Sequence, residues 1–415
     1  CTDCMALVRW LLENINATEF AAESADKARL HAVFVDLKKA FDACVREGIW
    51  TVLRRQGAPD HFVDVLQSFH DGMMCTVRGE DGVGDAFPCN TGVRQGCIIA
   101  PFLLNALYGA ALAVWRDGLP DEVGVRFTYY PNTFNPGSRD QSRSSSVLKG
   151  KLTDVIYADD STLCFSTWET CKAGYASFVD VCNRFGFTIS TKKTKHMLSG
   201  DDDTGGQTLP NVDSKESFEF LGSAVQSDNG LRTAISNRLQ SAGRTWGKMK
   251  KPCFTNRLID TRTRVNCFLT FVVSRLLYGS EVWWNMTKVQ ERRVEMFYNR
   301  CVRSLAGTTL FRMRETHVSD LMLRTRLHMP PLRALLDRNV LRWIGHCVRM
   351  HPSRIPHQLL TARASHADGS SMCGTRFGFE HRVREAARAY DIHPASVTPT
   401  ALSRDQWRRA IHAAW

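Results

Sequence analysis

The 415-residue sequence has no hydrophobic run approaching the roughly 18–20 residues that a membrane-spanning helix needs. The best candidate, residues 101–115, is short, contains Asn105 and stops at Arg116. The sequence also lacks a secretory signal peptide and an initiator methionine, because it begins at Cys1 in what reads as the middle of a helix. We therefore expect a fragment of a longer, non-secreted protein that works in the nucleus or the cytoplasm.

Clustered metal-ligand pairs are scarce as well. The 14 cysteines are scattered singly, apart from Cys1 and Cys4, and that pair lacks the partner pair that a zinc site uses. His346, Cys347 and His351 form at most half of such a site. Single thiols stay reduced in the cytosol or nucleus and often behave as small hydrophobic side chains. The spacing therefore favours buried, unpaired thiols over a zinc site.

Acidic residues and lysine are scarce in the second half of the chain. Residues 1–230 contain 22 Lys or Arg and 30 Asp or Glu, which gives a net charge of −8. Residues 231–415 contain 32 Lys or Arg and 12 Asp or Glu, which gives a net charge of +20. Only four of those 32 basic residues are lysines. A solvated helix surface normally mixes the two signs more evenly. The arginine-rich half therefore favours nucleic-acid binding, next to an acidic half that favours metal binding.

Apolar sequence is plentiful, since 43% of the residues are hydrophobic and 10% are aromatic. A chain of this length and composition predicts two or three domains with real cores. The first part mixes strands with helices, and from Leu231 the periodicity is helical. Residues 124–150, rich in Ser, Asn, Pro and Arg, read as a mobile insertion. For the helix predicted over 60–71, the residues expected to point inward are Phe62, Val65, Leu66 and Phe69.

The stretch from Val155 to Phe165 reads as a β-hairpin, because apolar, β-branched and aromatic residues flank a small polar centre. The tip of this hairpin carries Asp159 and Asp160. Two carboxylates held close together repel each other unless a cation compensates, and hard oxygen ligands favour magnesium. The alternative is a solvent-exposed turn, where aspartate is common.

Further polar segments follow predicted buried elements in the same half. Asp36 ends a predicted buried strand and precedes a helix, which is a common placement for a catalytic acid. Residues 90–101 form a glycine-punctuated loop before a helix. Glycine permits close approach to a ligand, although this loop alone reads as a turn. A basic cluster at 192–195 and a strand with a turn at 218–223 come later.

In this order the segments resemble the palm of reverse transcriptases, with a closer likeness to the polymerase of LINE-type retrotransposons, which lack long terminal repeats. Three phrases carry the resemblance: FVDLKKAFD at 34–42, GVRQGC at 92–97 and YADD at 157–160. Residues 341–350 and 404–408 resemble segments that such proteins carry beyond the thumb. The resemblance covers nearly the whole chain, and its palm motifs are specific as an ordered set.

The resemblance implies an α+β fold, with an antiparallel palm sheet packed against helices and followed by a helical thumb. The implied domains are a remnant of the fingers at 1–30, a palm at 31–225, a thumb at 226–310 and a basic helical C-terminal region at 311–415. Most of the fingers, which would grip the incoming triphosphate, are missing. The implied fragment is therefore expected to bind primer and template but to polymerise poorly.

Residue by residue, the resemblance implies that Asp36 and Asp159 hold two Mg²⁺ ions and that Asp160 is the supporting third carboxylate. Lys193 would protonate pyrophosphate, unless it belongs to a solvated basic loop. Phe41 would exclude a ribose 2′-hydroxyl, unless it is an ordinary core residue. The implied nucleotide-binding residues also include Arg94, Gln95 and Gly96, and the implied primer grip is formed by Phe220, Leu221 and Gly222.

The implied function is RNA-directed DNA polymerisation, in which deoxynucleoside triphosphates extend a DNA primer or target on an RNA template. One alternative is an inactive remnant that binds nucleic acid through its arginine-rich half. The missing fingers favour that remnant, whereas the retained Asp36, Asp159 and Asp160 disfavour it. A second alternative is a metal-dependent phosphohydrolase that uses the same carboxylates. Such an enzyme would need neither Gln95 and Gly96 nor the turn at 220–222.

Overall fold

The computed structural model describes residues 1–18, 29–80, 82–130, 134, 147–364 and 378–412. Its internal contacts divide the chain into two units. The first, here called the sheet unit, comprises Arg29–Val125 and Lys151–Lys215. The second, here called the helical unit, comprises Cys1–Ala28, Arg126–Gly150 and Glu216–Trp415. These boundaries differ from those of the implied domains, and the domain assignment stays a prediction.

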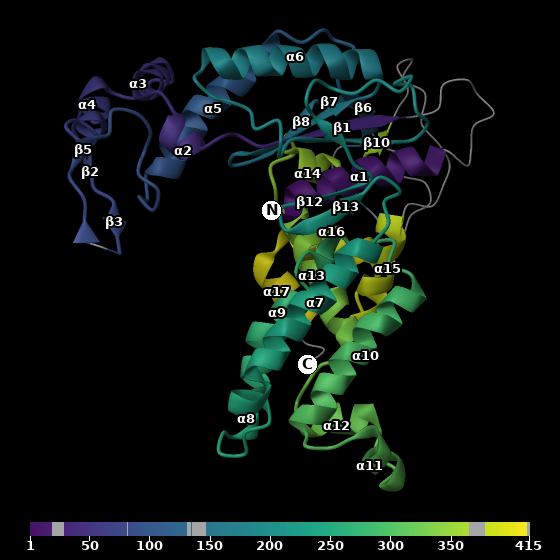
Figure 1. Ribbon diagram of the computed structural model, residues 1–415. Helices are drawn as coiled ribbons and strands as arrows, with labels where there is room; N and C mark the ends of the chain where they lie inside the picture. Colours follow the sequence, from purple (N-terminus) through teal and green to yellow (C-terminus); the bar gives the residue numbers. More distant parts are fainter. Residues whose placement is uncertain (19–28, 81, 131–133, 135–146, 365–377, 413–415) are drawn as a thin grey trace. The chain divides into compact units, whose positions relative to one another are not determined.

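The sheet unit is built on a five-stranded sheet with the order β11-β10-β1-β9-β8. Figure 1 labels β1, β8 and β10 of this sheet. All neighbouring strands are antiparallel except β10 and β11. The six residues of β1 are all buried, which confirms the buried strand predicted before Asp36. The pairing of β8 with β9 confirms the predicted hairpin. The strands are β1 (Leu30–Val35), β8 (Asp154–Tyr157), β9 (Asp160–Phe165), β10 (Lys195–Ser199) and β11 (Asp213–Ser214).

Two long helices, α5 (Ala100–Asp117) and α6 (Trp168–Arg184), share one hydrophobic core with this sheet (Figure 1). Pro101 lies in the first turn of α5, where a missing amide hydrogen costs nothing. Thr167 caps α6, because its hydroxyl accepts the Thr170 amide hydrogen at 3.3 Å. The core combines Val33, Val35, Leu163 and Phe165 of the strands with Leu103, Leu107, Trp115 and Phe178 of the helices.

Short elements complete the sheet unit: α2 (Ala40–Ala43), α3 (Arg46–Arg55), α4 (Asp60–Ser68) and the strand pairs β2 (Met74–Cys75) with β5 (Phe87–Pro88) and β3 (Arg78–Gly79) with β4 (Gly82–Val83). The predicted inward face of α4 is wrong for three residues, because Phe62, Val65 and Phe69 are 44%, 52% and 65% exposed. Only Val63 and Leu66 are buried. Helix α4 has apolar residues on more than one side, and the side with Val63 and Leu66 is the buried one. Helix α4 packs on α3.

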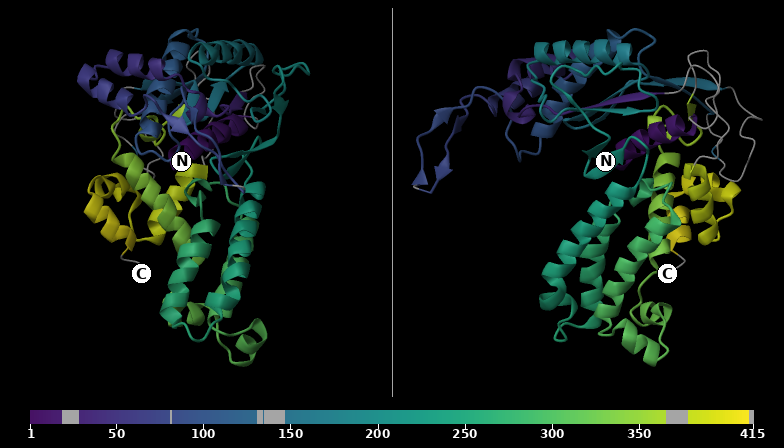
Figure 2. Two further views of the ribbon diagram at one scale, coloured as in Figure 1. Left: turned by 60° about the vertical axis from the view of Figure 1, so that its left-hand side comes forward. Right: turned by 45° about the vertical axis from the view of Figure 1, so that its right-hand side comes forward.

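The helical unit contains two long helices, α7 (Arg232–Met249) and α10 (Lys288–Leu305), which lie side by side (Figure 2). Between them in sequence come α8 (Thr261–Cys267), a π-helical turn at Phe268–Val273 and α9 (Ser274–Leu276). The prediction of helices from Leu231 onward is confirmed. In the described part of the chain, no helix combines the length and apolar character needed to cross a membrane.

Helix α13 (Leu332–Val348) is the central helix of the C-terminal part. Helices α15 (Gly378–Ala389), α16 (Val397–Leu402) and α17 (Arg404–His412) pack on it. Trp407 of α17 lies over Gly345 of α13, where a Cβ atom would approach the indole Nε1 to 2.1 Å. The same Nε1 donates to the Leu341 carbonyl at 3.1 Å. The two C-terminal phrases singled out in the sequence therefore pack against each other.

Helix α1 (Thr2–Thr18) is tied to the hairpin of β12 (Ser217–Phe220) and β13 (Ser223–Gln226) through the buried side chain of Arg9. Its guanidinium donates to the carbonyls of Ala224, Asn229 and Gly230 at 2.8, 3.1 and 3.0 Å. Burial lowers the pKa of Arg9 to about 10, so the group stays charged at neutral pH. A buried charge needs such partners, which fixes α1 to this hairpin.

The insertion expected at 124–150 lies partly outside the described residues. Its two ends form β6 (Val125–Tyr129) and β7 (Leu148–Leu152), which join β14 (Arg363–Ala364) in a three-stranded sheet. The remaining short helices of the helical unit are α11 (Leu310–Glu315), α12 (Asp320–Arg326) and α14 (Ile355–Gln358).

Glu13 of α1 gives the helical unit a pH-dependent contact, since its carboxylate accepts the Phe379 amide hydrogen at 3.2 Å, in the first turn of α15. Burial raises the pKa of Glu13 to about 7, although the amide donors oppose this shift. An acid with a raised folded-state pKa stabilises the fold fully below its unfolded-state pKa of 4.5, and this contribution is lost as the pH rises through about 7. We expect Glu13→Gln to be more stable than wild type at pH 8 by about 2–3 kcal/mol.

The measurement is the free energy of unfolding between pH 4 and pH 8 for both proteins. Exposed Glu169, paired with Lys172 at 3.0 Å, offers the matched control Glu169→Gln. That control should keep the wild-type pH dependence. Equal slopes for Glu13→Gln and wild type would show that Glu13 does not titrate in this range.

Candidate active site

The register of the sheet gathers the three predicted acids at one end. Val35 of β1 lies opposite Ser161 of β9, so the next residue, Asp36, lies beside Asp160. Ala158 and Asp159 form the two-residue turn between β8 and β9. Ala158 has a φ of 55°, as the tight hairpin turns that match strand twist require. The carboxylates of Asp36, Asp159 and Asp160 therefore belong to one edge of the sheet unit.

Backbone hydrogen bonds fix Asp36 just beyond the end of β1. Its carbonyl accepts the Ser190 amide hydrogen at 2.8 Å, and its own amide donates to Thr194 Oγ1 at 3.4 Å. Lys193 lies in the same turn, with its Nζ 3.3 Å from Asp36 Oδ2. The Lys193 side chain is 71% exposed. The structure thus brings the predicted lysine to the predicted acid.

The electrostatics of this edge favour a bound cation. Burial, followed by the negative charges of Asp159 and Asp36, raises the pKa of Asp160, and the positive charge of Lys193 only partly opposes this. Asp36 Oδ2 is buried, and the cationic group beside it is the Lys193 ammonium group at 3.3 Å. Carboxylate oxygens are the ligands that hard divalent cations prefer. The residues present therefore fit a divalent metal ion.

The three carboxylates are not drawn together as tightly as metal ligands. Within the described ranges, three possible ligand side chains have all their ligand atoms within 4.8 Å of one another, and these are His31, Cys171 and His196. Three acids without a compensating cation repel one another, and the positive charge of Lys193 offsets this repulsion only in part.

The glycine-punctuated loop packs against the helix that follows Asp36. Gly92 has a φ of 76°, and a Cβ atom there would lie 2.5 Å from the Asp42 carbonyl oxygen. The Val93 amide donates to the Phe41 carbonyl at 2.7 Å, and Gln95 Nε2 donates to Asp42 Oδ1 at 3.4 Å. This close approach, which only glycine permits, places Gln95 next to the segment that carries Phe41.

The other predicted nucleotide-binding residues differ in exposure. Phe41 is partly buried against the core of the sheet unit, so ordinary packing accounts for its position and its role toward a sugar stays a prediction. Arg94 is exposed, with Nε 3.1 Å from Met73 Sδ. Gly96 has a φ of 86° and is exposed, with open space where a Cβ atom would lie.

The predicted primer grip is the turn between β12 and β13, in the helical unit. Leu221 and Gly222 have φ values of 48° and 72°, as a two-residue hairpin turn requires at both positions. Tyr278 donates its hydroxyl hydrogen to the Leu221 carbonyl at 2.8 Å, and the Arg238 guanidinium donates to the Gly222 carbonyl. Arg238 also stacks over the Tyr278 ring, 5.0 Å from its centroid. Two side chains thus hold this backbone in place.

Arg46 is a positioning residue that the sequence interpretation missed. Its buried guanidinium donates to the Gly92 carbonyl at 2.8 Å, the His70 carbonyl at 3.0 Å and the Thr91 carbonyl at 3.2 Å. It therefore supports the loop that carries Gln95. A signal was present, because Arg46 shares helical spacing with three buried apolar residues of α3, namely Ile49, Trp50 and Leu53.

We expect Arg46→Met to destabilise the protein by about 3 kcal/mol, because it leaves buried carbonyls without donors. Arg54→Met on the same helix is the matched control. Arg54 is 38% exposed and pairs with Asp60 and Asp64 at 3.0 and 2.7 Å, so losing its surface pairs should change stability by less than about 1 kcal/mol. Chemical denaturation measures both variants. Equal losses of stability in the two variants would show that Arg46 stabilises the protein no more than an exposed ion pair does.

A family comparison accounts for the first half of the chain. The family model described as "Reverse transcriptase (RNA-dependent DNA polymerase)" matches residues 10–225. This range contains the three carboxylates, the glycine loop, Lys193 and the β12–β13 turn.

Several proteins are similar to this chain in sequence. A transposon-derived protein of Caenorhabditis elegans is 28% identical over 211 residues, covering 49% of this chain and 74% of that protein. The Pol polyprotein of a type-2 retrotransposable element of Drosophila melanogaster is 33% identical over 92 residues, 22% of this chain and 8% of that protein. An RNA-directed DNA polymerase from transposon BS of the same fly is 20% identical over 350 residues, 81% of this chain and 35% of that protein. The chain therefore spans only a small part of the two fly proteins.

Among solved structures, telomerase from Candida tropicalis is similar over 88% of this chain and 58% of that chain, with 12% sequence identity and a TM-score of 0.37. The α+β character is seen directly in the sheet unit and its covering helices.

Proposed function

The chain belongs to the reverse transcriptase family, and from this premise we propose that it extends a DNA primer or target on an RNA template with deoxynucleoside triphosphates, as the polymerase of a LINE-type retrotransposon. The observation that carries the proposal is the gathering of Asp36, Asp159 and Asp160 at one edge of the sheet, beside Lys193. A nuclear or cytoplasmic location belongs to the proposal, because the described cysteines are all free thiols.

In this proposal Asp36 and Asp159 hold two Mg²⁺ ions, and Asp160 supports them. When bound, such ions supply activation of the primer 3′-hydroxyl and stabilisation of the leaving pyrophosphate. The buried Asp36 Oδ2, which already attracts the Lys193 ammonium group, and the raised pKa of Asp160 both support a cation at this edge. Magnesium suits these ligands, because all of them are carboxylate oxygens.

Lys193 has two successive roles in this proposal. Without a metal ion its ammonium group neutralises Asp36, from which Nζ is 3.3 Å away. Metal ions held by Asp36 would compensate its charge, which would free the exposed lysine from that pairing. The ammonium group can then donate a proton to an oxygen of the departing pyrophosphate.

Substrate positioning falls to the neighbouring backbone. Gln95 and Gly96 lie along the nascent base pair, and Arg94 contributes a charge at the exposed rim of the same loop. Phe41 discriminates against a ribose 2′-hydroxyl. Its carbonyl accepts the Val93 amide hydrogen, so Phe41 is held next to the loop that carries Gln95, and this supports the assigned role. The turn formed by Phe220, Leu221 and Gly222 holds the primer end, and the hydrogen bonds from Tyr278 and Arg238 that fix its backbone support this role.

A second candidate function, nucleic-acid binding without synthesis, rests on the helical unit. A groove of about 970 Å³ lies between α7 and α10, and it is lined by Arg293, Arg300 and Arg303 among other residues. Arg303 pairs with Asp320 at 2.9 Å, whereas Arg300 stacks on Phe297 with its guanidinium 5.5 Å from the ring centroid. Arginines on one groove suit phosphate contacts, which both candidate functions need.

Binding of a primer–template duplex should therefore weaken steeply as salt concentration rises. Arg300→Ala should weaken binding for every sequence alike and reduce the salt slope by about 1, the expected effect of losing one phosphate contact. Arg184→Ala on α6, where the side chain is 64% exposed, is the matched control outside residues 231–415. Affinity that does not depend on salt would contradict the proposed contact.

The deciding experiment is primer extension on an RNA template with Mg²⁺, in parallel reactions with deoxynucleotides and ribonucleotides. We expect extension that requires the metal and prefers deoxynucleotides. Duplex binding without extension under all metal conditions would favour the binding-only alternative. Release of phosphate from a nucleic acid without templated synthesis would favour a phosphohydrolase.

A further inference from the structure

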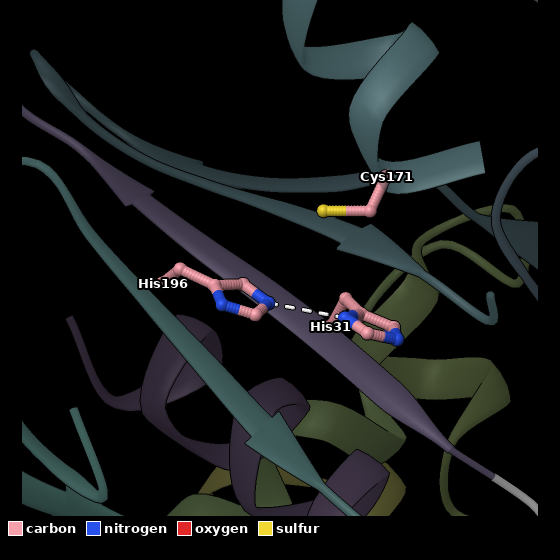
Figure 3. A group of neighbouring side chains, drawn as sticks. All are labelled: His31, Cys171 and His196. Atoms are coloured by element: carbon pink, nitrogen blue, oxygen red, sulfur yellow. Dashed lines mark hydrogen bonds between the residues drawn. The ribbon is translucent and has the colours of Figure 1, made fainter. Parts of the chain in front are cut away.

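A second cluster of ligand-type side chains lies at the opposite end of β1 from Asp36. His31 is the second residue of β1, His196 belongs to β10, and Cys171 lies in the first turn of α6 (Figure 3). Val33 lies opposite His196 in the register, so both imidazoles are on the face of the sheet that α6 covers. The three side chains are 0%, 3% and 0% exposed.

The geometry of this cluster is that of a nearly formed coordination site. His31 Nδ1 and His196 Nε2 face each other at 3.0 Å, and the ligand atoms of all three residues lie within 4.8 Å of one another. Two ligand atoms on a tetrahedral zinc ion lie roughly 3.3–3.6 Å apart, given metal–ligand bonds of about 2.0–2.3 Å. Small side-chain movements therefore suffice for all three atoms to reach one metal ion.

Asp203 sets the tautomer of His31. Its Oδ1 lies 2.8 Å from His31 Nε2, and its Oδ2 accepts the Trp168 amide hydrogen at 3.0 Å, at the start of α6. With its Nε2 hydrogen donated to this carboxylate, neutral His31 presents the Nδ1 lone pair to the cluster. A carboxylate that orients a histidine in this way is the usual partner of a metal-binding imidazole.

We propose that His31, His196 and Cys171 bind one Zn²⁺ ion, with Asp203 orienting His31. Two imidazoles and one thiolate form a ligand set that suits zinc and excludes magnesium, so this site is chemically distinct from the carboxylate edge. The fourth position of a tetrahedral ion is left for a water molecule. The proposal does not depend on polymerase activity.

Protonation states in the cluster are consistent with metal binding near pH 7. Burial lowers the pKa of His196 to about 4 and also lowers the pKa of His31, so both rings are neutral and have lone pairs available. Burial raises the pKa of Cys171, which is therefore a thiol in the absence of metal. Binding of one zinc ion would convert it to a thiolate and release one proton to solvent.

The ion would join three segments, and each of them is connected along the chain to the edge that carries Asp36, Asp159 and Asp160. Strand β1 runs into Asp36, β10 follows the turn that holds Lys193, and α6 follows the strand that begins with Asp160. A metal ion bound to the folded state and not to the unfolded chain raises the unfolding midpoint. The ion is thus a structural support for the sheet unit, placed away from the chemistry.

The first test measures zinc in protein purified without chelators, and then replaces it with Co²⁺. We expect about one equivalent of zinc per chain, and a near-ultraviolet thiolate-to-cobalt charge-transfer band together with the visible bands of a tetrahedral site. Cys182→Ser is the matched control, because Cys182 is also a buried thiol on α6. The control should keep the zinc and the cobalt bands, and Cys171→Ser should lose both.

Two further measurements keep the proposal open to refutation if Cys171→Ser does not fold. A chelator should lower the unfolding midpoint of wild type and of Cys182→Ser. Asp203→Asn should fold and bind zinc about 10- to 100-fold more weakly, as expected when the partner of a ligand histidine is lost. Folded wild-type protein with no zinc and no thiolate–cobalt band would overturn the proposal, leaving a hydrogen-bonded histidine pair. Thiolate bands that persist in Cys171→Ser would overturn it too.

Discussion

Asp159→Asn should abolish metal-dependent primer extension while leaving the fold and duplex binding intact. Asp159 lies in the exposed turn between β8 and β9, where an amide of the same size causes no burial or packing problem. Loss of one metal-ligand charge removes several kcal/mol of transition-state stabilisation, which corresponds to a rate loss of roughly a thousandfold or more. Extension rates with saturating primer–template, read beside an independent binding titration, separate the chemical step from docking.

The matched control for this variant is Asp180→Asn. Asp180 is another exposed carboxylate of the sheet unit, on α6, and its contact with Arg184 is a long one at 3.9 Å. Asp180→Asn should retain wild-type extension. If Asp159→Asn lowers the unfolding midpoint far more than Asp180→Asn, Asp159 is structural, and if it extends primers normally, the metal assignment at the turn fails.

Gly345→Ala should destabilise the C-terminal part of the helical unit by about 3 kcal/mol, the upper range for overpacking a buried site. The added Cβ atom would approach Trp407 Nε1 to 2.1 Å, and the indole has little room to retreat because it is fully buried and bonded to the Leu341 carbonyl. Denaturant unfolding monitored by near-ultraviolet circular dichroism, which reports on buried tryptophan, measures the loss.

Gly247→Ala provides the opposite expectation within the same unit. Gly247 is in α7, and nothing lies within 4 Å of a Cβ atom at that position. Alanine should therefore stabilise by up to about 1 kcal/mol through helix propensity.

A double mutant of Gly345→Ala with Trp407→Phe should recover part of the loss, because the smaller ring frees space. Strictly additive losses would show that the two residues do not interact.

Local patterns predicted the strand and the hairpin that carry the three acids. The buried strand before Asp36 and the hairpin ending in Asp159 and Asp160 follow from alternation and from turn chemistry, which are encoded within about ten neighbouring residues. The proximity of Asp36 to that hairpin needed the resemblance, since nothing in local sequence says that residues 36 and 160 become neighbours. The inward face of α4 was wrong because a short helix with several apolar sides does not reveal which side meets a partner.

Features made by long-range contacts could not be predicted from local sequence. Cys171 and His196 follow His31 by 140 and 165 positions along the chain. No spacing rule for metal ligands covers such distances. Gly345 and Trp407 stood out only as members of separate phrases, although each determines the size that the other can have. Arg46 had a local signal, since it interrupts an apolar helix face, but its carbonyl partners come from two other segments, one with His70 and one with Thr91 and Gly92.

The interleaving of the two units has a consequence for synthesis of the chain. Arg9 completes its hydrogen bonds only with Ala224, Asn229 and Gly230, more than 200 positions later. At a translation rate of about 5–20 residues per second, α1 waits for roughly 10–40 seconds after its own synthesis. During that interval α1 lacks the later segments on which it packs, namely Ser280–Val282, α14 and β14, while the sheet unit between can already fold. The nascent helix is therefore a natural site for chaperone binding on the ribosome, and its docking is a late event in folding.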